Sequence, residues 1–212
     1  MDLLLRQYIM HHISRVQMKH LSISANQTSI NFDNVLIGTL PDLVVVGLVS
    51  DADLASGYQR NPFNFRNFGV NRNELKRNGT SRPSEDYTSN FATGQYIKAY
   101  STFLQKLECD TGDKSVSLTP SDWANWYTLN AFKIIDGPIG PGTYGPHSKS
   151  ATGSARLEVS FIAAVNKNIK VFVLYQMLGR IEFDRFNLVL VLWALAVDFT
   201  LEDRMFSLKA CG

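Results

Sequence analysis

The side chains that could hold a metal ion are spread along the chain without ligand-like spacing. The four histidines are His11, His12, His20 and His147. A site on one helix or hairpin needs a second ligand type a few residues away, and none of the four has one. In a strand, the adjacent His11 and His12 would point to opposite faces. We therefore expect no metal and no other cofactor.

Three other patterns could support binding or catalysis, and each lacks a required part. Asp51 and Asp53 lack the further oxygen ligands of a calcium loop. Glu182 and Asp184 would lie on the same face of an extended segment, as the two carboxylates of a glycosidase could, but no other group converges on them. Cys109 has no placed histidine, and there is no Gly-x-Ser-x-Gly elbow. We expect no enzyme activity and no small-molecule substrate.

The composition is that of one globular domain. The 212 residues are 45% hydrophobic and 19% charged, and 21 basic and 19 acidic residues give a net charge of +2. This excess is too small to neutralise many phosphates, so we expect no sequence-specific nucleic-acid binding. The longest apolar run, residues 188–197, is far shorter than the roughly 20 residues of a membrane span. The start of the chain lacks the basic region of a signal peptide. We expect neither membrane insertion nor secretion.

Alternating and β-branched segments predict a β-rich fold. Residues 16–24 alternate with a phase change between Met18 and Leu21, which predicts a half-buried strand with a bulge. The run LVVVGLV, residues 43–49, predicts a strand buried on both faces. Residues 157–165 and 169–177 alternate on either side of a turn. Because there is no strand–helix–strand rhythm, we predict an all-β fold, an antiparallel jelly-roll β-sandwich.

One helix and two connections complete the predicted domain. Residues 94–107 carry apolar side chains at helical spacing, which predicts one short helix in an inter-strand insertion. The Asn78-Gly79 pair predicts a tight hairpin turn, and residues 136–153, rich in Gly and Pro, predict a long loop. We divide the chain into an N-terminal lead-in (1–15), a jelly-roll domain (16–192) and a C-terminal tail (193–212) to which the pattern assigns no structure.

The segment NPFNFRNFGVNRNELKRNG, residues 61–79, combines basic and aromatic side chains. Basic groups could hold phosphates while the rings stack on bases. However, the Pro and Asn residues predict an irregular connection, in which the rings anchor a loop to the core. The later charges include Glu74 and fall on a strand that ends at the hairpin. We interpret the segment as an inter-strand connection.

Several blocks between residues 16 and 191 resemble, in order, the C-terminal part of the major capsid protein, or hexon, of adintoviruses and related Polinton (Maverick) elements. The longest block is LPDLVVVGLVSDADLASGYQRNPFNFRNF, residues 40–68. The others are RNGT (77–80), the tyrosine-bearing segment 96–100, YTLNAF (127–132), GSARLEVSF (153–161) and RIEFDR (180–185). The resemblance implies a double-jelly-roll capsid protein that trimerises into pseudo-hexameric capsomers of an icosahedral shell. This chain has the length of the second jelly roll only, as a truncated or endogenised copy would.

The resemblance implies a structural virion protein, found in the virion or the host-cell interior, that self-associates as a trimer and contacts other capsid proteins. The expected inter-subunit or loop-anchoring residues lie in the 61–68 block and the 136–153 loop; they are Asn61, Pro62, Phe63, Phe65, Phe68 and Tyr144. The alternative is a host-encoded jelly-roll binding module, lectin-like or protein-binding, derived from a viral or transposon gene. That module would present Trp123, Trp126 and Tyr127 to a sugar or peptide.

Overall fold

The computed structural model describes residues 9–55, 58–81, 87–107, 109, 117–134, 152–183 and 189–192. The first sheet contains β1 (Ile9–Ile23), β3 (Leu43–Ser50), β7 (Leu129–Lys133), β9 (Ile169–Phe183) and β10 (Val189–Leu192). The second contains β2 (Ser29–Thr39), β4 (Val70–Arg77), β5 (Thr80–Ser81), β6 (Tyr87–Thr88) and β8 (Thr152–Phe161). The helices within these ranges are α1 (Asp51–Leu54), α2 (Ile97–Lys106) and α3 (Pro120–Trp126).

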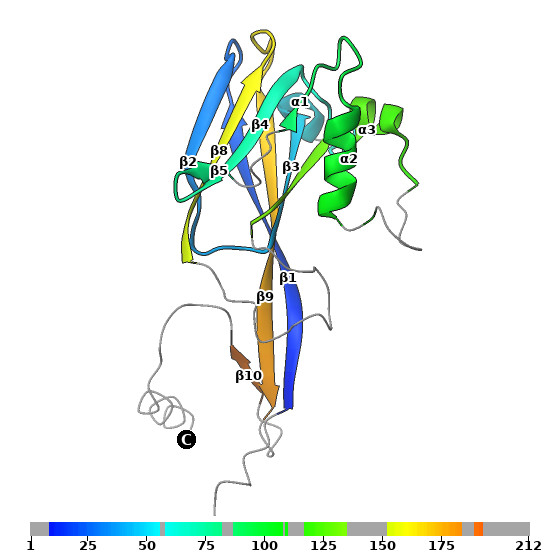
Figure 1. Cartoon of the computed structure of the whole chain (residues 1–212). Coiled ribbons are helices and arrows are strands. Elements are labelled where there is room, and N and C mark those ends of the chain that lie inside the picture. The colour runs from blue at the N-terminus through cyan, green and yellow to red at the C-terminus, as the bar shows by residue number, and fades with distance from the viewer. Residues whose placement is uncertain are drawn as a thin grey trace, which may run out of the picture.

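The strand order is that of a jelly roll. The first sheet runs β1-β9-β3-β7, with β10 beside β9, and the second runs β2-β8-β4-β5, with β6 beside β4 (Figure 1). All of these pairs are antiparallel. The chain changes sheet between β1 and β2, β2 and β3, β3 and β4, β6 and β7, β7 and β8, and β8 and β9, so most sequence neighbours lie in opposite sheets of the sandwich. The structure confirms the predicted all-β antiparallel jelly-roll sandwich.

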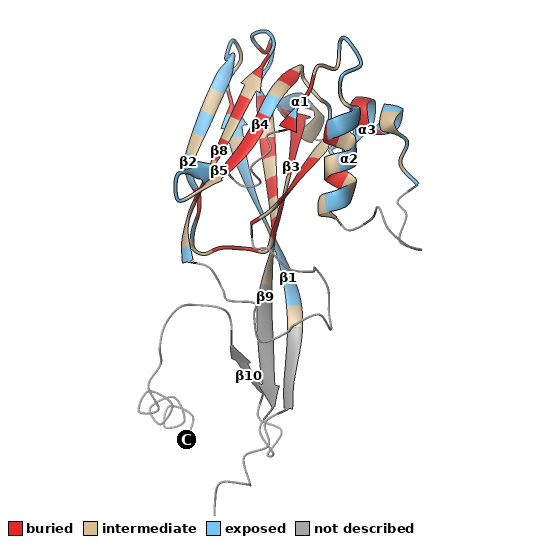
Figure 2. Ribbon diagram, viewed as in Figure 1, coloured by how far each residue is buried: buried red, intermediate tan, exposed pale blue. Residues whose placement is uncertain are grey.

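The core lies between the two sheets. Alternate residues of β3, β8 and β9 meet there, including Val46, Leu157 and Val173, none more than 1% exposed. Figure 2 shows buried residues along β3, β4, β7 and β8, whereas most of β2 and, apart from Ile23, the residues of β1 with an assigned burial are exposed or intermediate. Burying the inner faces of both sheets is the main stabilising contribution to such a sandwich.

The predicted hairpin and helix are present. Asn78 and Gly79 both have positive φ, 48° and 81°, as the turn between β4 and β5 requires. The expectation of a single helix was wrong, because α1 and α3 accompany α2, and α2 and α3 lie together on one side of the sandwich (Figure 1). The structure shows a capped start for α3: the Thr119 hydroxyl accepts a hydrogen bond from the amide of Asp122 at 3.1 Å, and Pro120 is the first helical residue.

The bulge predicted in the first strand from its change of apolar parity is also absent from the described β1–β9 pairing. β1 pairs with β9 without a bulge from Ile9↔Phe183 to Ile23↔Ile169. Val16 and Met18 therefore point to the outside of the sandwich, while Ile23 points to the core. The apolar residues change parity because both faces of this sheet carry apolar side chains. Residues 193–212 and most of 1–15 lie outside the described residues, so the domain limits stay a prediction.

Candidate interaction surface

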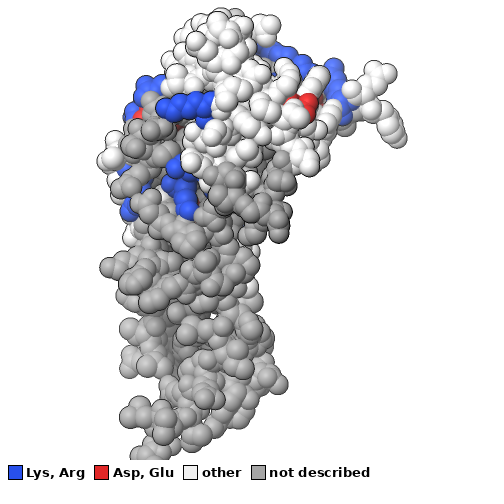
Figure 3. Space-filling model, turned by 45° about the vertical axis from the view of Figure 1, so that its right-hand side comes forward, with Lys and Arg blue, Asp and Glu red and all other residues white. Residues whose placement is uncertain are grey.

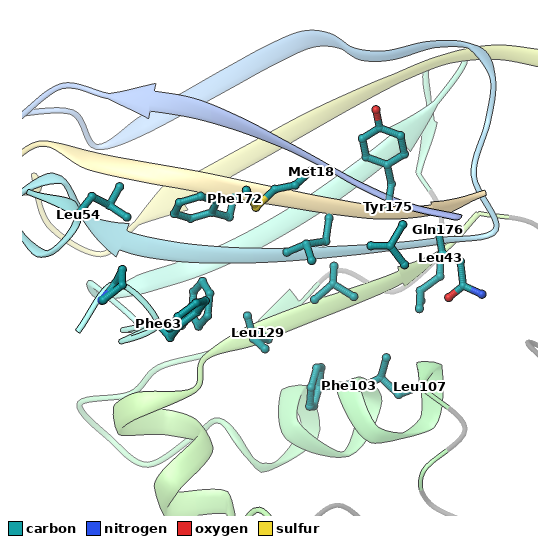
Figure 4. A pocket seen from close by; sticks show the side chains of 15 residues that line it. Met18, Leu43, Leu54, Phe63, Phe103, Leu107, Leu129, Phe172, Tyr175 and Gln176 are labelled. Carbon is teal, nitrogen blue, oxygen red and sulfur yellow. The ribbon is translucent and has the colours of Figure 1, made fainter. Parts of the chain in front are cut away.

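A groove with apolar walls lies on the outer face of the first sheet. Its volume is about 630 Å³. The strands contribute Val16 and Met18 (β1), Leu43 and Val45 (β3), Leu129 (β7), and Phe172, Leu174, Tyr175 and Gln176 (β9). The remaining wall comes from α1, α2 and the 61–68 block: Leu54, Pro62, Phe63, Phe65, Phe103 and Leu107. In Figure 4, Leu129, Leu43 and Gln176 of the sheet lie on the side of Phe103 and Leu107 of α2, whereas the Tyr175 ring points to the other side.

The strand periodicity explains how these side chains reach the outer face. In β3, Val44 and Val46 are buried in the core, so Val45 between them points outward. In β9, Val171 and Val173 are likewise buried in the core. The register places Leu174 of β9 beside both Met18 of β1 and Val45 of β3. Three neighbouring strands thus present one continuous apolar row on the outside.

The 61–68 block is fixed to this face by Phe65. Its ring packs over Gly47 of β3, where a Cβ atom would lie 2.6 Å from Phe65 Cδ1. The ring also meets Phe172 edge-on, with centroids 6.3 Å apart. Two backbone hydrogen bonds hold the segment: the Arg66 amide donates to the Leu48 carbonyl at 3.1 Å, and the Thr128 amide donates to the Phe65 carbonyl at 2.9 Å. Gly47 is therefore required here for close approach rather than for a turn.

The structure places the other candidate residues from the 61–68 block in different environments. Phe63 lines the groove and is 69% exposed. The neighbouring Pro62 also lines the groove, while the Asn61 side-chain oxygen accepts the Phe63 amide at 2.9 Å and shapes the turn. Phe68 does not line the groove: it packs against the core, with the Lys167 ammonium 5.5 Å from its ring centre. Tyr144 lies outside the described residues.

The helices α2 and α3 form an aromatic cluster beside the sheet. Trp123 is 0% exposed, and its indole N–H donates to the Leu129 carbonyl at 3.1 Å. The rings of Phe91, Tyr96, Tyr100 and Phe103 surround it, with centroids 5.7 to 6.5 Å apart along the cluster. Trp123 therefore cannot belong to the surface platform of the lectin-like alternative. Trp126 and Tyr127 are 50% and 47% exposed.

The outer face of the second sheet is charged. Glu74 of β4 and Glu158 of β8 are paired residues, and the Lys76 ammonium lies 2.8 Å from Glu158 and 3.6 Å from Glu74. Arg72 also contacts Glu74 at 2.8 Å, and Arg156 contacts Glu158 at 3.1 Å. The hydrogen bond from Lys76 lowers the pKa of Glu158 and raises the pKa of Lys76.

These ion pairs account for two of the basic residues that suggested nucleic-acid binding. Both Arg72 and Lys76 contact a carboxylate, although the Arg72 side chain is still 48% exposed. On the face drawn in Figure 3, Lys and Arg side chains lie in separate groups among uncharged residues. Such an arrangement does not form the continuous basic stripe that tracks a phosphate backbone.

The other ionisable groups with a shifted pKa, among the residues that the structure describes, do not line the groove. Burial raises the pKa of Tyr87, whose hydroxyl donates to the Ala131 carbonyl at 2.6 Å and accepts the Ala131 amide at 3.2 Å. Burial also raises the pKa of Asp42, against the opposing charge of Lys133. Within the described ranges, no three His, Cys, Asp or Glu side chains are grouped closely enough to hold a metal ion. In the same part of the chain, no helix has the length and apolarity of a membrane span.

Sequence reasoning missed most of the groove. The rings of Phe63 and Phe65 were identified, but the outward residues of β1, β3, β7 and β9 were not. Two signals pointed to them: the change of parity after Met18, and the unbroken apolar run of β3. Both indicate a sheet with apolar side chains on its two faces.

Comparison with known proteins gives structural matches only. No family model and no curated protein matches the chain. The chain is similar to VP54 of PBCV-1, a crystal structure fitted into a cryo-EM reconstruction of the virophage Sputnik, with a TM-score of 0.52, 10% identity, and coverage of 89% of this chain and 52% of that chain. A quasi-atomic model of the PBCV-1 virus capsid gives a TM-score of 0.52 at 9% identity, covering 90% and 52%. This chain therefore has the jelly-roll fold of viral capsid proteins and spans about half the length of these relatives.

Proposed function

We propose that this chain is a structural subunit of a virus-type shell, equivalent to one jelly roll of a double-jelly-roll major capsid protein. The observation that carries the proposal is the strand order β1-β9-β3-β7 over β2-β8-β4-β5, matched to PBCV-1 capsid structures over about nine-tenths of this chain and about half of theirs. The blocks that resemble adintovirus and Polinton hexons support the C-terminal jelly roll as the equivalent half. In this role the assembling unit is residues 16–192, and its place is the virion.

A shell subunit works through shape and contact rather than through chemistry. The sandwich supplies a closely packed body with a buried core between its sheets. The groove supplies an apolar contact surface, and the 61–68 block forms one of its walls. We assign the contacts between subunits to this block and to the 136–153 loop, with three copies forming a capsomer and further contacts to other capsid proteins.

Assembly of the purified chain tests this function. Size-exclusion chromatography with light scattering should give a discrete oligomer, with three copies as the expected unit, and electron microscopy should show closed or curved arrays. Phe63→Glu is a better contact probe than Phe65→Glu, because Phe65 packs on Gly47 and its replacement would disturb the loop itself. A chain that stays monomeric at every concentration and never forms arrays contradicts the proposed function.

A second candidate is a host-encoded binding module, favoured by the exposure of Trp126 and Tyr127. The Arg66 guanidinium lies 5.6 Å from the Trp126 ring centre, so the ring is partly covered by a cation. With Trp123 buried, the platform is reduced to two rings. A glycan array and quenching of tryptophan fluorescence test this function, with Trp126→Ala as the variant that should abolish any signal.

A further inference from the structure

We propose that the groove on the outer face of the first sheet is the surface through which one copy of this chain packs against a second copy. The inference rests on the proposed function, because it states how subunits of a shell made from this chain meet. Phe63, Val16 and Met18 are 69%, 61% and 58% exposed, and all three line the groove. Soluble monomers rarely expose continuous apolar surface of this kind, and such surface usually marks an interaction site.

The chemistry of the lining restricts the occupant. None of the described residues that line the groove is Asp, Glu, Lys, Arg or His. Gln176 contributes a polar side chain to the groove, whereas the Tyr175 ring has the strand parity of Val173, and its hydroxyl lies 2.7 Å from the Gln17 side-chain amide and points away from Phe103 and Leu107 (Figure 4). The groove therefore has no charge with which to recognise a phosphate, a carboxylate or a cation. Removal of apolar surface from water is the driving force left for binding.

A second copy is the occupant that fits the assembly. In a shell built from this chain the groove recurs in every subunit, so its occupant must be present once per subunit, as another copy always is. The length of the related capsid chain agrees with this stoichiometry. This chain covers 52% of PBCV-1 VP54, so VP54 has nearly as much chain again outside the matched part. A second copy supplies a body of comparable size.

The groove has two rims that can be altered separately. The first is Val16 and Met18 on β1, which is the edge strand of the described sheet. The second is Phe63, which belongs to the 61–68 block and not to the sheet. Val45, Phe172 and Leu174 form part of the floor. A copy seated in the groove contacts both rims, whereas a chain that adds a strand to the free edge of β1 contacts only the first.

Three variants of the full chain test the inference. The double variant Val16→Glu/Met18→Glu charges one rim, and Phe63→Glu charges the other. Ile37→Glu is the matched control, because Ile37 is a 72% exposed apolar residue on β2 of the opposite sheet. Light scattering over a concentration series should show the dissociation constant raised by about tenfold or more in each rim variant and unchanged in the control, with far-UV circular dichroism verifying the fold.

The outcomes separate this inference from the proposed function. Wild-type association that survives in both rim variants overturns the groove as the interface and leaves the shell function standing. Loss of association in the Val16→Glu/Met18→Glu variant alone indicates pairing at the β1 edge and also overturns the inference. A wild-type chain that is monomeric at every concentration overturns it directly. An oligomer that needs both rims, but never gives curved arrays in electron microscopy, supports the inference and contradicts the shell function.

Discussion

Gly47→Ala should destabilise the protein by forcing Phe65 off the outer face of the first sheet. The added Cβ would lie 2.6 Å from Phe65 Cδ1 and 2.7 Å from Leu129 Cδ2, and Gly47 is buried between partners on β7 and β9. Overpacking of this kind costs about 1–3 kcal/mol, and removing a flexible glycine from a strand returns about 0.5–1 kcal/mol. We expect a net loss of about 1–2 kcal/mol in the free energy of unfolding.

A double-mutant cycle with Phe65→Ala identifies the cause of this loss. If the clash with Phe65 dominates, Gly47→Ala should cost clearly less in the Phe65→Ala background, where only the contact with Leu129 remains. Urea unfolding of the four proteins, followed by circular dichroism, measures the coupling energy. Strictly additive effects, or a Gly47→Ala protein as stable as the wild type, would refute the idea that Gly47 is there to admit the ring.

Three further predictions concern other contacts. The pKa of Glu158 is lowered in the folded state, so its ionised carboxylate stabilises the fold at pH values above the unfolded-state pKa of about 4.5, and this contribution is lost as the pH falls through the folded-state pKa. The urea midpoint of Glu158→Gln should therefore depend less on pH in this range than that of the wild type. Thr119→Ala should cost about 0.5–2 kcal/mol by removing the cap of α3, seen as a lower urea midpoint, with Thr119→Ser as the control. Tyr87→Phe should cost about 1–3 kcal/mol, measured by calorimetry, because it leaves both polar backbone groups of Ala131 without the phenol.

The fold was predictable from sequence because its strands carry local signals. The β-branched run of β3 and the Asn78-Gly79 turn need little tertiary context, and both are where the pattern placed them. The groove was harder to predict, because its walls come from residues far apart in sequence, such as Met18, Phe65 and Leu174. Their parity becomes informative only once the register of β1, β3 and β9 is known. The exposure of Phe63, beside the anchored Phe65, has no sequence signal at all.

The central place of β9 in its sheet has a consequence for biosynthesis. β9 lies between β1 and β3, yet it is made more than a hundred residues after β3 ends. At about 5–20 residues per second, the ribosome needs on the order of ten seconds to cover that interval. During this interval β1 has no described partner, and β3 lacks both neighbouring strands until β7 is made and one of them, β9, thereafter, so that apolar side chains of both strands are exposed. We expect nascent chains to recruit holdase chaperones in this window and to reach the native state only after β9 leaves the exit tunnel.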